Sequence, residues 1–240
     1  MYEFDYTVEY VDIDKNNKLS NYGFFKILQE AGCLHADTVG FGLKDTPKNR
    51  IAWIVLDWKL KIFSRPQWNS KVHIKTWISN VDMVCYFRDY EILDLTGKVI
   101  AKATSRWCLL NIDTHHIIKI TPEIKTAFLP IENGNFDDKI QKLIDPKFFE
   151  LEYPYTILRR DIDTNNHLNN LNYIVLAEQA LPEDVYSNYS FSEIEVMYKK
   201  QCILGDNVLL CYSQEAPNKH VVSIKSLDKN TLHSIIRFSI

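Results

Sequence analysis

The chain of 240 residues has no long hydrophobic run, no excess of basic residues, and few glycines or prolines. Its longest uninterrupted apolar stretch, 51–56, is far shorter than the about 20 residues that a membrane-spanning helix needs. Lys and Arg (28) are slightly outnumbered by Asp and Glu (31), which argues against a general nucleic-acid binder. The first residues carry acids where a secretory signal peptide would carry Lys or Arg. We therefore expect a cytoplasmic protein with no membrane span and no nucleic-acid partner.

Cysteine is sparse and shows no pattern. The five cysteines are scattered, odd in number and without a Cys-x-x-Cys pair, so neither a disulfide framework nor a structural zinc site is expected. The sequence contains no Gly-rich phosphate loop, no Rossmann or P-loop spacing and no cluster of metal-ligating residues. It therefore predicts no metal and no cofactor.

Aromatic side chains, in contrast, make up 12% of the residues, and several runs alternate between apolar and polar types. Aromatic and β-branched residues suit a half-buried pleated sheet, and a period of two is typical of strands. The pattern predicts strands at 51–63, 71–78, 86–95 and 98–111, and again at 193–201, 207–213, 220–227 and 232–240.

The sequence also contains an internal repeat. Residues 12–21, Asp-Ile-Asp-Lys-Asn-Asn-Lys-Leu-Ser-Asn, match residues 161–170, Asp-Ile-Asp-Thr-Asn-Asn-His-Leu-Asn-Asn, at seven of ten positions with an offset of 149. Each copy follows an extended stretch, 6–11 or 155–160, and precedes apolar residues at helical spacing. A period this long with two copies indicates a duplicated domain rather than a solenoid.

A helix followed by strands, twice over, predicts an α+β fold in which each of two units wraps an antiparallel sheet around a long helix. We expect the first unit at residues 1–125 and the second at 154–240. The segment between them, 126–153, is expected to be a linker with a short helix around 137–144.

Residues 161–173 carry a longer pattern, Asp-x-Asp-x-Asn-x-His-x-Asn-Asn-x-x-Tyr. In this pattern the chain resembles the acyl-ACP thioesterases of plants and bacteria, whose motif it matches at every specified position. The first half resembles them too, at 28–31, 53–55, 65–68, 76–77 and 103–107. The resemblance implies a tandem (double) hot-dog fold. It also implies hydrolysis of the thioester between a fatty acyl chain and acyl carrier protein (ACP), which releases the fatty acid and ends chain elongation.

The catalytic residues are implied by the same resemblance. The family's Asp, Asn and His fall on Asp163, Asn165 and His167, and its Cys falls on Cys202. Gln201 stands where the family has Glu, and an amide cannot act as a base. Any role that needs a carboxylate therefore falls to Asp163.

Two schemes remain open for the chemistry. In one, His167 takes the proton of Cys202 and the thiolate attacks, while Asn165 orients the imidazole. In the other, Asp163 activates water or attacks directly, while Asn165 and backbone amides hold the carbonyl oxygen. We favour the second scheme, because hot-dog thioesterases generally work from a carboxylate. Gln201 is able to donate a hydrogen bond in either scheme.

Purely structural roles compete with these assignments. Asp and Asn residues before a helix usually form turns and N-caps, and the first copy carries Lys18 at the position of His167. We therefore expect no catalysis from the first copy, and turn or cap roles for Asp161, Asn166 and Asn170.

Four residues are candidates for substrate binding: Asn169 and Tyr173 in the motif, and Trp53 and Trp58 in the first half. The resemblance implies that tryptophans of the first half line an acyl tunnel. Packing of the hydrophobic core would explain the two tryptophans equally well.

Two basic pairs flank the motif residues in the sequence, Arg159 with Arg160 and Lys199 with Lys200. ACP is acidic, so we expect these pairs to form its docking surface beside the site; ordinary solvated charge is the alternative. The expected partner is ACP, and a homodimer is left open. The alternative functions are an acyl-CoA thioesterase and a non-catalytic acyl-binding hot-dog protein.

Overall fold

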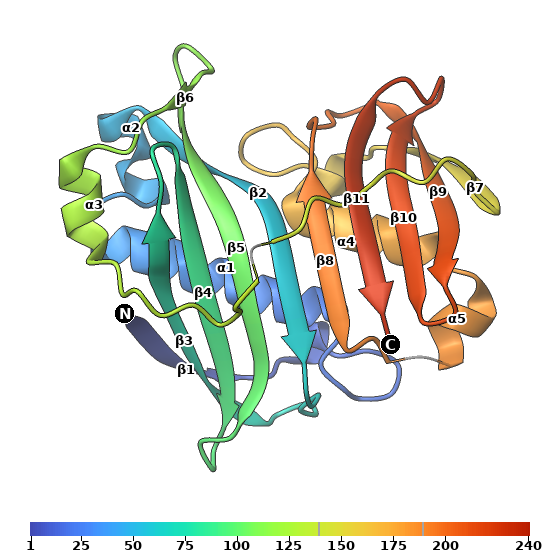
Figure 1. Cartoon of the computed structure of the whole chain (residues 1–240), viewed down its shortest axis with the longest axis horizontal. Helices are drawn as coiled ribbons and strands as arrows, with labels where there is room; N and C mark the ends of the chain where they lie inside the picture. Colours follow the sequence, from blue (N-terminus) through green and yellow to red (C-terminus); the bar gives the residue numbers. More distant parts are fainter. Residues whose placement is uncertain (139, 189) are drawn as a thin grey trace. The chain divides into compact units, whose positions relative to one another are not determined.

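The computed structural model describes residues 1–138, 140–188 and 190–240. The chain divides into two compact units, Met1–Ile140 and Gln141–Ile240, which we call the first and the second unit. The division falls within 126–153, where the sequence analysis expects a linker. In each unit a helix lies against an antiparallel sheet (Figure 1).

In the first unit the strands are ordered β1-β3-β4-β5-β2, all antiparallel to their neighbours, and β6 pairs with β5. The strands are β1 (Tyr2–Thr7), β2 (Ile51–Ile62), β3 (Lys71–Val81), β4 (Cys85–Asp94), β5 (Val99–Asn111) and β6 (Ile117–Ile118). The helices are α1 (Asn21–Thr38), α2 (Thr46–Asn49) and α3 (Pro122–Phe128), with 3₁₀ turns η1 (Tyr10–Asp12) and η2 (Leu43–Asp45).

Helix α1 packs onto this sheet because its apolar side chains recur at helical spacing. Phe24, Ile27 and Leu28 are buried on the side that faces the strands. The helix begins where the Ser20 side chain accepts a hydrogen bond from the backbone N–H of Gly23 (2.9 Å). A Cβ at Gly23 would lie 2.4 Å from the carbonyl oxygen of Asp12, so only glycine allows this close approach.

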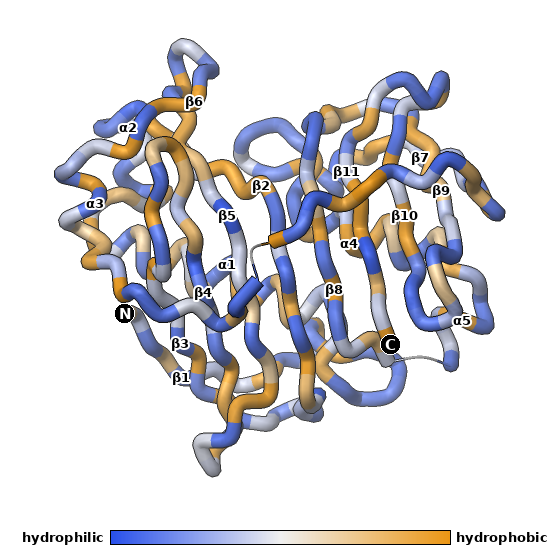
Figure 2. The backbone as a smooth tube through the Cα atoms, in the orientation of Figure 1, coloured by the Kyte–Doolittle hydropathy of each residue, from blue (hydrophilic) through white to orange (hydrophobic). Residues whose placement is uncertain are grey.

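In the second unit the strands are ordered β8-β11-β10-β9-β7, again antiparallel. They are β7 (Leu151–Thr156), β8 (Glu193–Tyr198), β9 (Asn207–Ala216), β10 (Lys219–Ser226) and β11 (Leu232–Ser239). Helix α4 (Asn170–Gln179) contacts β10 and β11, and the 3₁₀ turn η3 (Arg159–Asp161) and helix α5 (Glu183–Asn188) complete the unit. Hydrophobic positions recur along the strands of both units, and the turns between them are largely hydrophilic (Figure 2).

The eight strands predicted from alternation are present, with ends that differ by a few residues. The extended stretches expected at 6–11 and 155–160 are placed too late, since β1 and β7 end at Thr7 and Thr156 and are followed by 3₁₀ turns. Strand β8 stops at Tyr198 rather than at residue 201, because the next two backbone N–H groups both turn to the carbonyl oxygen of His233.

The helix expected around 137–144 is wrong for the described residues of that stretch, and Lys139 lies outside them. Leu143 instead packs into a hydrophobic cluster with Met197, Val221 and Ile235. Because this side chain is buried against its own unit, the segment follows the sheet and does not form the expected helix.

Each unit binds its own part of the segment 126–153. In the first unit Asn135 donates its backbone N–H to the Asp89 carboxylate (2.9 Å) and its side-chain amide to the carbonyl oxygen of Tyr90 (2.7 Å). In the second unit the Asp145 carboxylate accepts from Ser223 (2.7 Å) and Lys225 (2.5 Å). The described part of this segment is therefore attached to the sheets by specific polar contacts.

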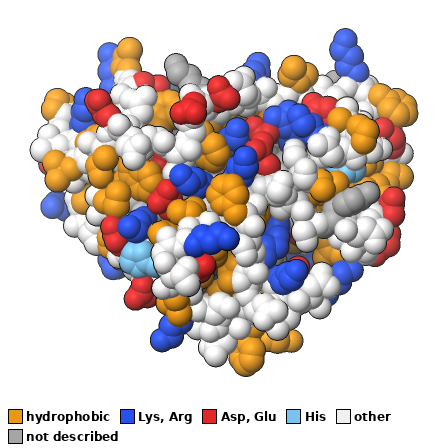
Figure 3. Space-filling model, turned by 60° about the horizontal axis from the view of Figure 1, so that its bottom comes forward, with side chains coloured by type: hydrophobic (Ala, Val, Ile, Leu, Met, Phe, Trp, Pro, Cys, Tyr) orange, Lys and Arg blue, Asp and Glu red, His pale blue; other side chains and the backbone are white. Residues whose placement is uncertain are grey.

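On the face drawn in Figure 3, basic and acidic side chains are interspersed among hydrophobic ones, in keeping with a formal net charge of only −3. Within the described residues, no helix combines the length and the apolar character that crossing a membrane requires.

His73 on β3 links two carboxylates of the neighbouring strand β1. Its Nδ1 lies 2.8 Å from the Asp5 carboxylate and its Nε2 lies 3.0 Å from that of Glu3. These hydrogen bonds raise the pKa of His73, and the bond to Asp5 has the larger effect. A raised pKa in the folded state stabilises the fold below the unfolded-state pKa, and this stabilisation is lost as the pH rises through the folded-state value.

We expect His73→Gln to lower the melting temperature between about pH 5 and 6, where the imidazole is charged and the carboxylates are ionised. The expected loss is under about 1 kcal/mol, because all three side chains are partly exposed. At about pH 9 the variant and the parent should melt together, since the imidazole is then neutral. A destabilisation of equal size at both pH values would show that packing, not charge, is responsible.

Candidate active site

The residues of the predicted catalytic motif form a closed turn before helix α4. The Asp163 carboxylate accepts hydrogen bonds from the backbone N–H groups of Asn165 (2.8 Å) and His167 (3.3 Å). The backbone N–H of Asp163 donates to the carbonyl oxygen of His167 (2.8 Å), and Asn166 adopts a left-handed conformation (φ 62°). Asp and Asn are the residues that support such turns, which explains the local sequence.

This turn is anchored by a second, buried carboxylate. Asp161 accepts hydrogen bonds from the backbone N–H of Leu158 (2.8 Å) and the hydroxyl of Tyr155 (2.8 Å). Its own carbonyl oxygen accepts from the backbone N–H of Asn169 (2.8 Å) and the side-chain amide of Asn172 (3.1 Å). The start of the helix and the end of β7 are therefore held by one residue.

The three side chains predicted to be catalytic all reach the solvent. Asn165 is exposed, and Asp163 and His167 are half-buried. Within the described part of the chain, neither the imidazole of His167 nor the side-chain amide of Asn165 makes a hydrogen bond. Both groups are therefore available to a bound substrate.

Cys202 lies directly behind this turn and is completely buried. Its carbonyl oxygen accepts from the backbone N–H of Leu168 (2.9 Å), and its own N–H donates to the hydroxyl of Tyr173 (3.0 Å). Burial raises the pKa of the Cys202 thiol to about 11. At neutral pH only about one molecule in ten thousand would then carry the thiolate, which weakens the scheme in which Cys202 attacks.

Gln201 and the two basic pairs are all exposed to solvent. The Arg160 guanidinium lies 3.8 Å from the Asp161 carboxylate and keeps most of its surface accessible. Arg159 and Arg160 lie in η3, directly before the turn. Lys199 and Lys200 follow β8 and lead to Cys202, which contacts the turn.

Asn169 and Tyr173 support the turn. The Asn169 side chain caps α4 by accepting from the backbone N–H of Leu171 (3.0 Å). Tyr173 is buried, binds the backbone of Cys202, and meets the ring of Tyr198 edge-on at 5.4 Å between centroids. Their contacts give both residues a positioning role.

Trp53 and Trp58 lie in an aromatic interior of the first unit. Trp53 donates its indole N–H to the carbonyl oxygen of Phe41 (2.8 Å) and contacts the rings of Tyr86 and Phe128. Trp58 is buried between Phe25 on α1 and Tyr90 on β4.

Arg88 in the same interior was not singled out from the sequence. Its guanidinium is buried, lies 2.9 Å from Nδ1 of His35 and donates to the hydroxyl of Thr76 (3.2 Å). Burial, followed by the neighbouring Arg88 charge, lowers the pKa of His35 to about 3, so the imidazole is neutral. Alternation along β4 places Arg88 on the same side as Tyr86 and Tyr90, a signal that the sequence did contain.

The first copy of the motif folds into the same turn. Asp14 accepts from the backbone N–H groups of Asn16 (2.8 Å) and Lys18 (3.1 Å), and Asn17 is left-handed (φ 59°). The carbonyl oxygen of Pro66 accepts from the backbone N–H of Leu19 (2.8 Å), as Cys202 does for Leu168. Lys18, Arg65 and Pro66 therefore occupy the positions of His167, Gln201 and Cys202.

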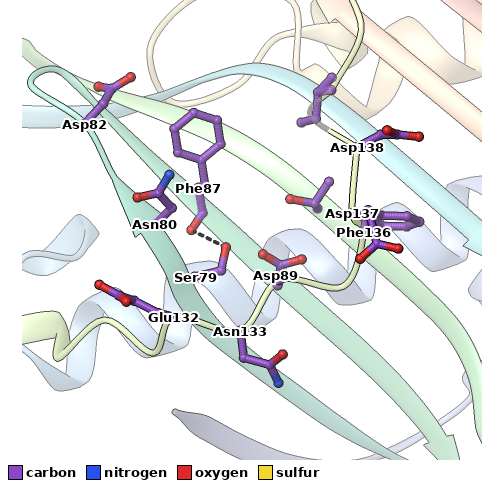
Figure 4. A pocket seen from close by; sticks show the side chains of 13 residues that line it. Ser79, Asn80, Asp82, Phe87, Asp89, Glu132, Asn133, Phe136, Asp137 and Asp138 are labelled. Atoms are coloured by element: carbon purple, nitrogen blue, oxygen red, sulfur yellow. Dashed lines mark hydrogen bonds between the residues drawn. The ribbon is translucent and has the colours of Figure 1, made fainter.

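The first unit contains a pocket of about 460 Å³ (Figure 4). Neither copy of the turn contributes a residue to its lining. It lies where β3 and β4 face the segment that follows residue 131, and the buried Asp89 lines it. Burial raises the pKa of the Asp89 carboxyl. Among the described residues no group of three or more His, Cys, Asp or Glu side chains is arranged to hold a metal ion.

Family models match both halves of the chain. The model of the acyl-ACP thioesterase N-terminal domain matches residues 1–128, and that of the C-terminal domain matches residues 146–238. The chain belongs to the acyl-ACP thioesterase family. The family is one of thioester hydrolases, as the names of its curated members state.

Named relatives come from plants. The chain is 28% identical over 251 residues to oleoyl-acyl carrier protein thioesterase 2, chloroplastic, of Arabidopsis thaliana. The aligned region covers 97% of this chain and 68% of that relative. It is 29% identical over 225 residues to the oleoyl-acyl carrier protein thioesterase, chloroplastic, of Coriandrum sativum. Here the aligned region covers 86% of this chain and 61% of the relative. The chain thus spans about two thirds of the length of these relatives.

Solved structures confirm the predicted hot-dog fold of the α+β class. An acyl-ACP thioesterase from Bacteroides thetaiotaomicron superposes with a TM-score of 0.88 at 19% identity, over 99% of this chain and 96% of that chain. The 12:0-ACP thioesterase from Umbellularia californica gives a TM-score of 0.85 at 19% identity, over the same shares of the two chains.

The two copies of the turn provide a test of which residue leads the chemistry. If Asp163 is the general base, Asp163→Asn should lower kcat/KM for an acyl thioester on the order of 100- to 10,000-fold, because the base is lost while the amide oxygen still accepts the turn's hydrogen bonds. Cys202→Ala should retain activity within a few-fold of the parent, because the buried thiol is protonated. The measurement is release of free thiol.

Asp14→Asn is the matched control, since it changes the same hydrogen-bond acceptor in the copy that carries Lys18. Its activity should equal that of the parent. A loss in Cys202→Ala comparable to that in Asp163→Asn would favour the thiolate scheme instead.

Proposed function

We propose that this protein hydrolyses the thioester of fatty acyl-ACP at the turn of residues 161–170, releasing a free fatty acid and the carrier's thiol. The observation that carries this proposal is the turn itself. It presents Asp163, Asn165 and His167 together at the surface, in a chain that belongs to the acyl-ACP thioesterase family.

In the proposed reaction Asp163 takes the proton of a water molecule that attacks the thioester carbon. The proton then passes to the departing sulfur, so a carboxylic acid and a thiol are formed. The two backbone N–H groups on one carboxylate oxygen fix the Asp163 side chain, and its other oxygen accepts no hydrogen bond among the described residues. This oxygen is the one that we assign to the water.

Asn165 and His167 are proposed to stabilise the negative charge that develops on the carbonyl oxygen. Both side chains carry N–H donors, and both lack a competing partner in the described structure. Donors that are already in place stabilise a developing oxyanion without a cost of reorganisation. Gln201, exposed next to Cys202, would add a neutral donor rather than a base.

The acyl chain is proposed to bind between α1 and the sheet of the first unit. Trp53, Trp58 and Phe128 line this interior, and such aromatic surfaces suit an alkyl chain. The second unit would then be the catalytic one. A cytoplasmic location and a homodimer stay predictions from the sequence; the plant relatives named above are chloroplastic.

The replacement of the family Glu by Gln201 is the observation that favours the alternative of a non-catalytic acyl-binding protein. Thiol release from acyl-ACP and acyl-CoA of several chain lengths separates the alternatives. Turnover of acyl-ACP at a higher kcat/KM than of acyl-CoA supports the proposal. Binding of acyl-ACP without thiol release would establish the non-catalytic function.

The basic pairs are proposed to recognise the acidic carrier. We expect the double charge reversal Arg160→Glu with Lys199→Glu to raise KM for acyl-ACP about 10-fold by weakening electrostatic attraction, with little change in kcat. The KM for a neutral, carrier-free acyl-N-acetylcysteamine thioester should not change. The control is an equal charge change at exposed lysines of the first unit, Lys18→Glu with Lys48→Glu. Equal KM increases for both substrates would contradict a docking role.

A further inference from the structure

Three apolar side chains beside the candidate active site are exposed to solvent. Leu158 is 42% exposed, and Ile203 and Leu204, in the turn between β8 and β9, are 51% and 52% exposed. We call these three residues the apolar tip. Large apolar side chains that gather at one exposed place commonly mark a site of interaction.

Backbone hydrogen bonds hold the apolar tip together. Ile157, next to Leu158, donates its N–H to the carbonyl oxygen of Asp206 (2.9 Å) and accepts at its own carbonyl from Gly205 (3.0 Å). Asp206 closes the turn by accepting the N–H of Ile203 on its side chain (2.9 Å). Leu158 is therefore fixed beside the turn that carries Ile203 and Leu204.

The apolar tip also adjoins the catalytic turn. Ile203 forms a β-bridge with His167, and the preceding residue, Cys202, binds the backbone of Leu168. A molecule that covers the apolar tip would thus lie next to the imidazole that we assign to the reaction.

Four cations adjoin the tip along the chain. Arg159 and Arg160 follow Leu158 directly, and Lys199 and Lys200 precede the turn, all with exposed side chains. Two carboxylates adjoin these residues in the sequence: Asp206 accepts a backbone N–H, and Asp161 is buried. Four exposed cations next to three exposed apolar residues, which we call the basic rim, stand out on a chain whose net charge is −3.

The first unit shows the same backbone, but it has no cation at the four equivalent positions and carries Lys18 and Arg65 in place of His167 and Gln201. Val8 exchanges hydrogen bonds with Ser70 and Asn69 (2.9 Å each), as Ile157 does with Asp206 and Gly205, and Lys18 bridges to Gln67 as His167 bridges to Ile203. Trp68, at the position of Leu204, is 55% exposed. The three residues that follow Val8 are Glu9, Tyr10 and Val11, in place of Leu158, Arg159 and Arg160. Both units therefore expose apolar residues here, and the basic rim belongs to the second.

We propose that the apolar tip and its four cations dock an acidic, amphipathic helix of ACP, whose apolar side covers Leu158, Ile203 and Leu204. The proposal rests on the proposed function, since it names the surface that receives the carrier of that substrate. An apolar centre within a charged rim is the arrangement in which buried contacts supply affinity and the surrounding charges supply orientation. The bridge between Ile203 and His167 explains how docking would bring the carrier's thioester to the turn.

The test is Leu204→Glu in the full chain, which puts a negative charge at the centre of the tip. We expect KM for acyl-ACP to rise on the order of 10-fold or more, as truncation of a central contact residue does. KM and kcat for the carrier-free acyl-N-acetylcysteamine thioester should stay at the parent's values, which also shows that the variant is folded. Trp68→Glu, the matched change in the first unit, should alter neither substrate.

Three outcomes would overturn the proposal. Unchanged KM for acyl-ACP in Leu204→Glu means that the carrier docks elsewhere. Equal losses with both substrates assign Leu204 to the reaction itself, and an equal effect of Trp68→Glu removes the preference for the second unit. Direct titration with a non-hydrolysable acyl-ACP separates this proposal from the function. If the parent hydrolyses neither thioester, weaker binding by Leu204→Glu still supports docking, and unchanged binding refutes it.

Discussion

The structure around the candidate site depends on carboxylates that collect backbone N–H groups in the turn before a helix. Asp12 and Asp161 are both buried, and each accepts a backbone N–H three residues earlier and a tyrosine hydroxyl six residues earlier. A buried carboxylate is tolerated only when its oxygens are hydrogen-bonded, so these contacts fix the chain direction where strand gives way to helix. The second carboxylate of each copy, at Asp14 or Asp163, then closes the loop that follows. The side chains that we propose to be catalytic are thus placed by a turn that also forms in the copy where no catalysis is expected.

The two copies differ in how the buried carboxylate is compensated. In the first unit Lys26 binds Asp12 (2.8 Å) as well as Glu9, and these contacts raise its pKa despite partial burial. The equivalent position in the second unit is Val175, and the cation that lies beside Asp161 among the described residues is the exposed Arg160, at 3.8 Å. The first turn is therefore bound by a lysine from its own helix, whereas the cation beside the second turn remains exposed to solvent. This difference agrees with a structural task for one copy and a binding task for the other.

Much of the fold could be predicted because the strands are long and alternate, so the positions of β2 to β5 and β8 to β11 follow from the period alone. Periodicity could not reveal the 3₁₀ turns, since these arise from the side-chain hydrogen bonds of Asp12 and Asp161 rather than from an apolar pattern. The helix expected near residue 140 does not form for a related reason. Packing of Leu143 on the sheet of its unit stabilises the chain more than a short isolated helix would. The motif located Asp163, Asn165 and His167 in one turn. The burial of Cys202 and its bond to Tyr173 depend on tertiary contacts that a single sequence does not encode locally.

The chemistry of position 202 is best understood by comparison with position 66. In both units this residue offers its carbonyl oxygen to the leucine that leads into the helix, and in the first unit it is a proline, which has no nucleophile at all. The backbone contact, rather than a thiol, is what the fold requires there. The preceding residue has a longer reach: Arg65 donates to the carbonyl oxygen of Leu19 (2.8 Å) and to the side chain of Asn21 (2.6 Å), at the start of α1. Gln201 occupies the same backbone position in the second unit, but its side chain is two bonds shorter than that of Arg65 and is exposed to solvent. An amide there is a neutral donor, which agrees with the proposal that Asp163 supplies the base and that uncharged N–H groups stabilise the developing oxyanion.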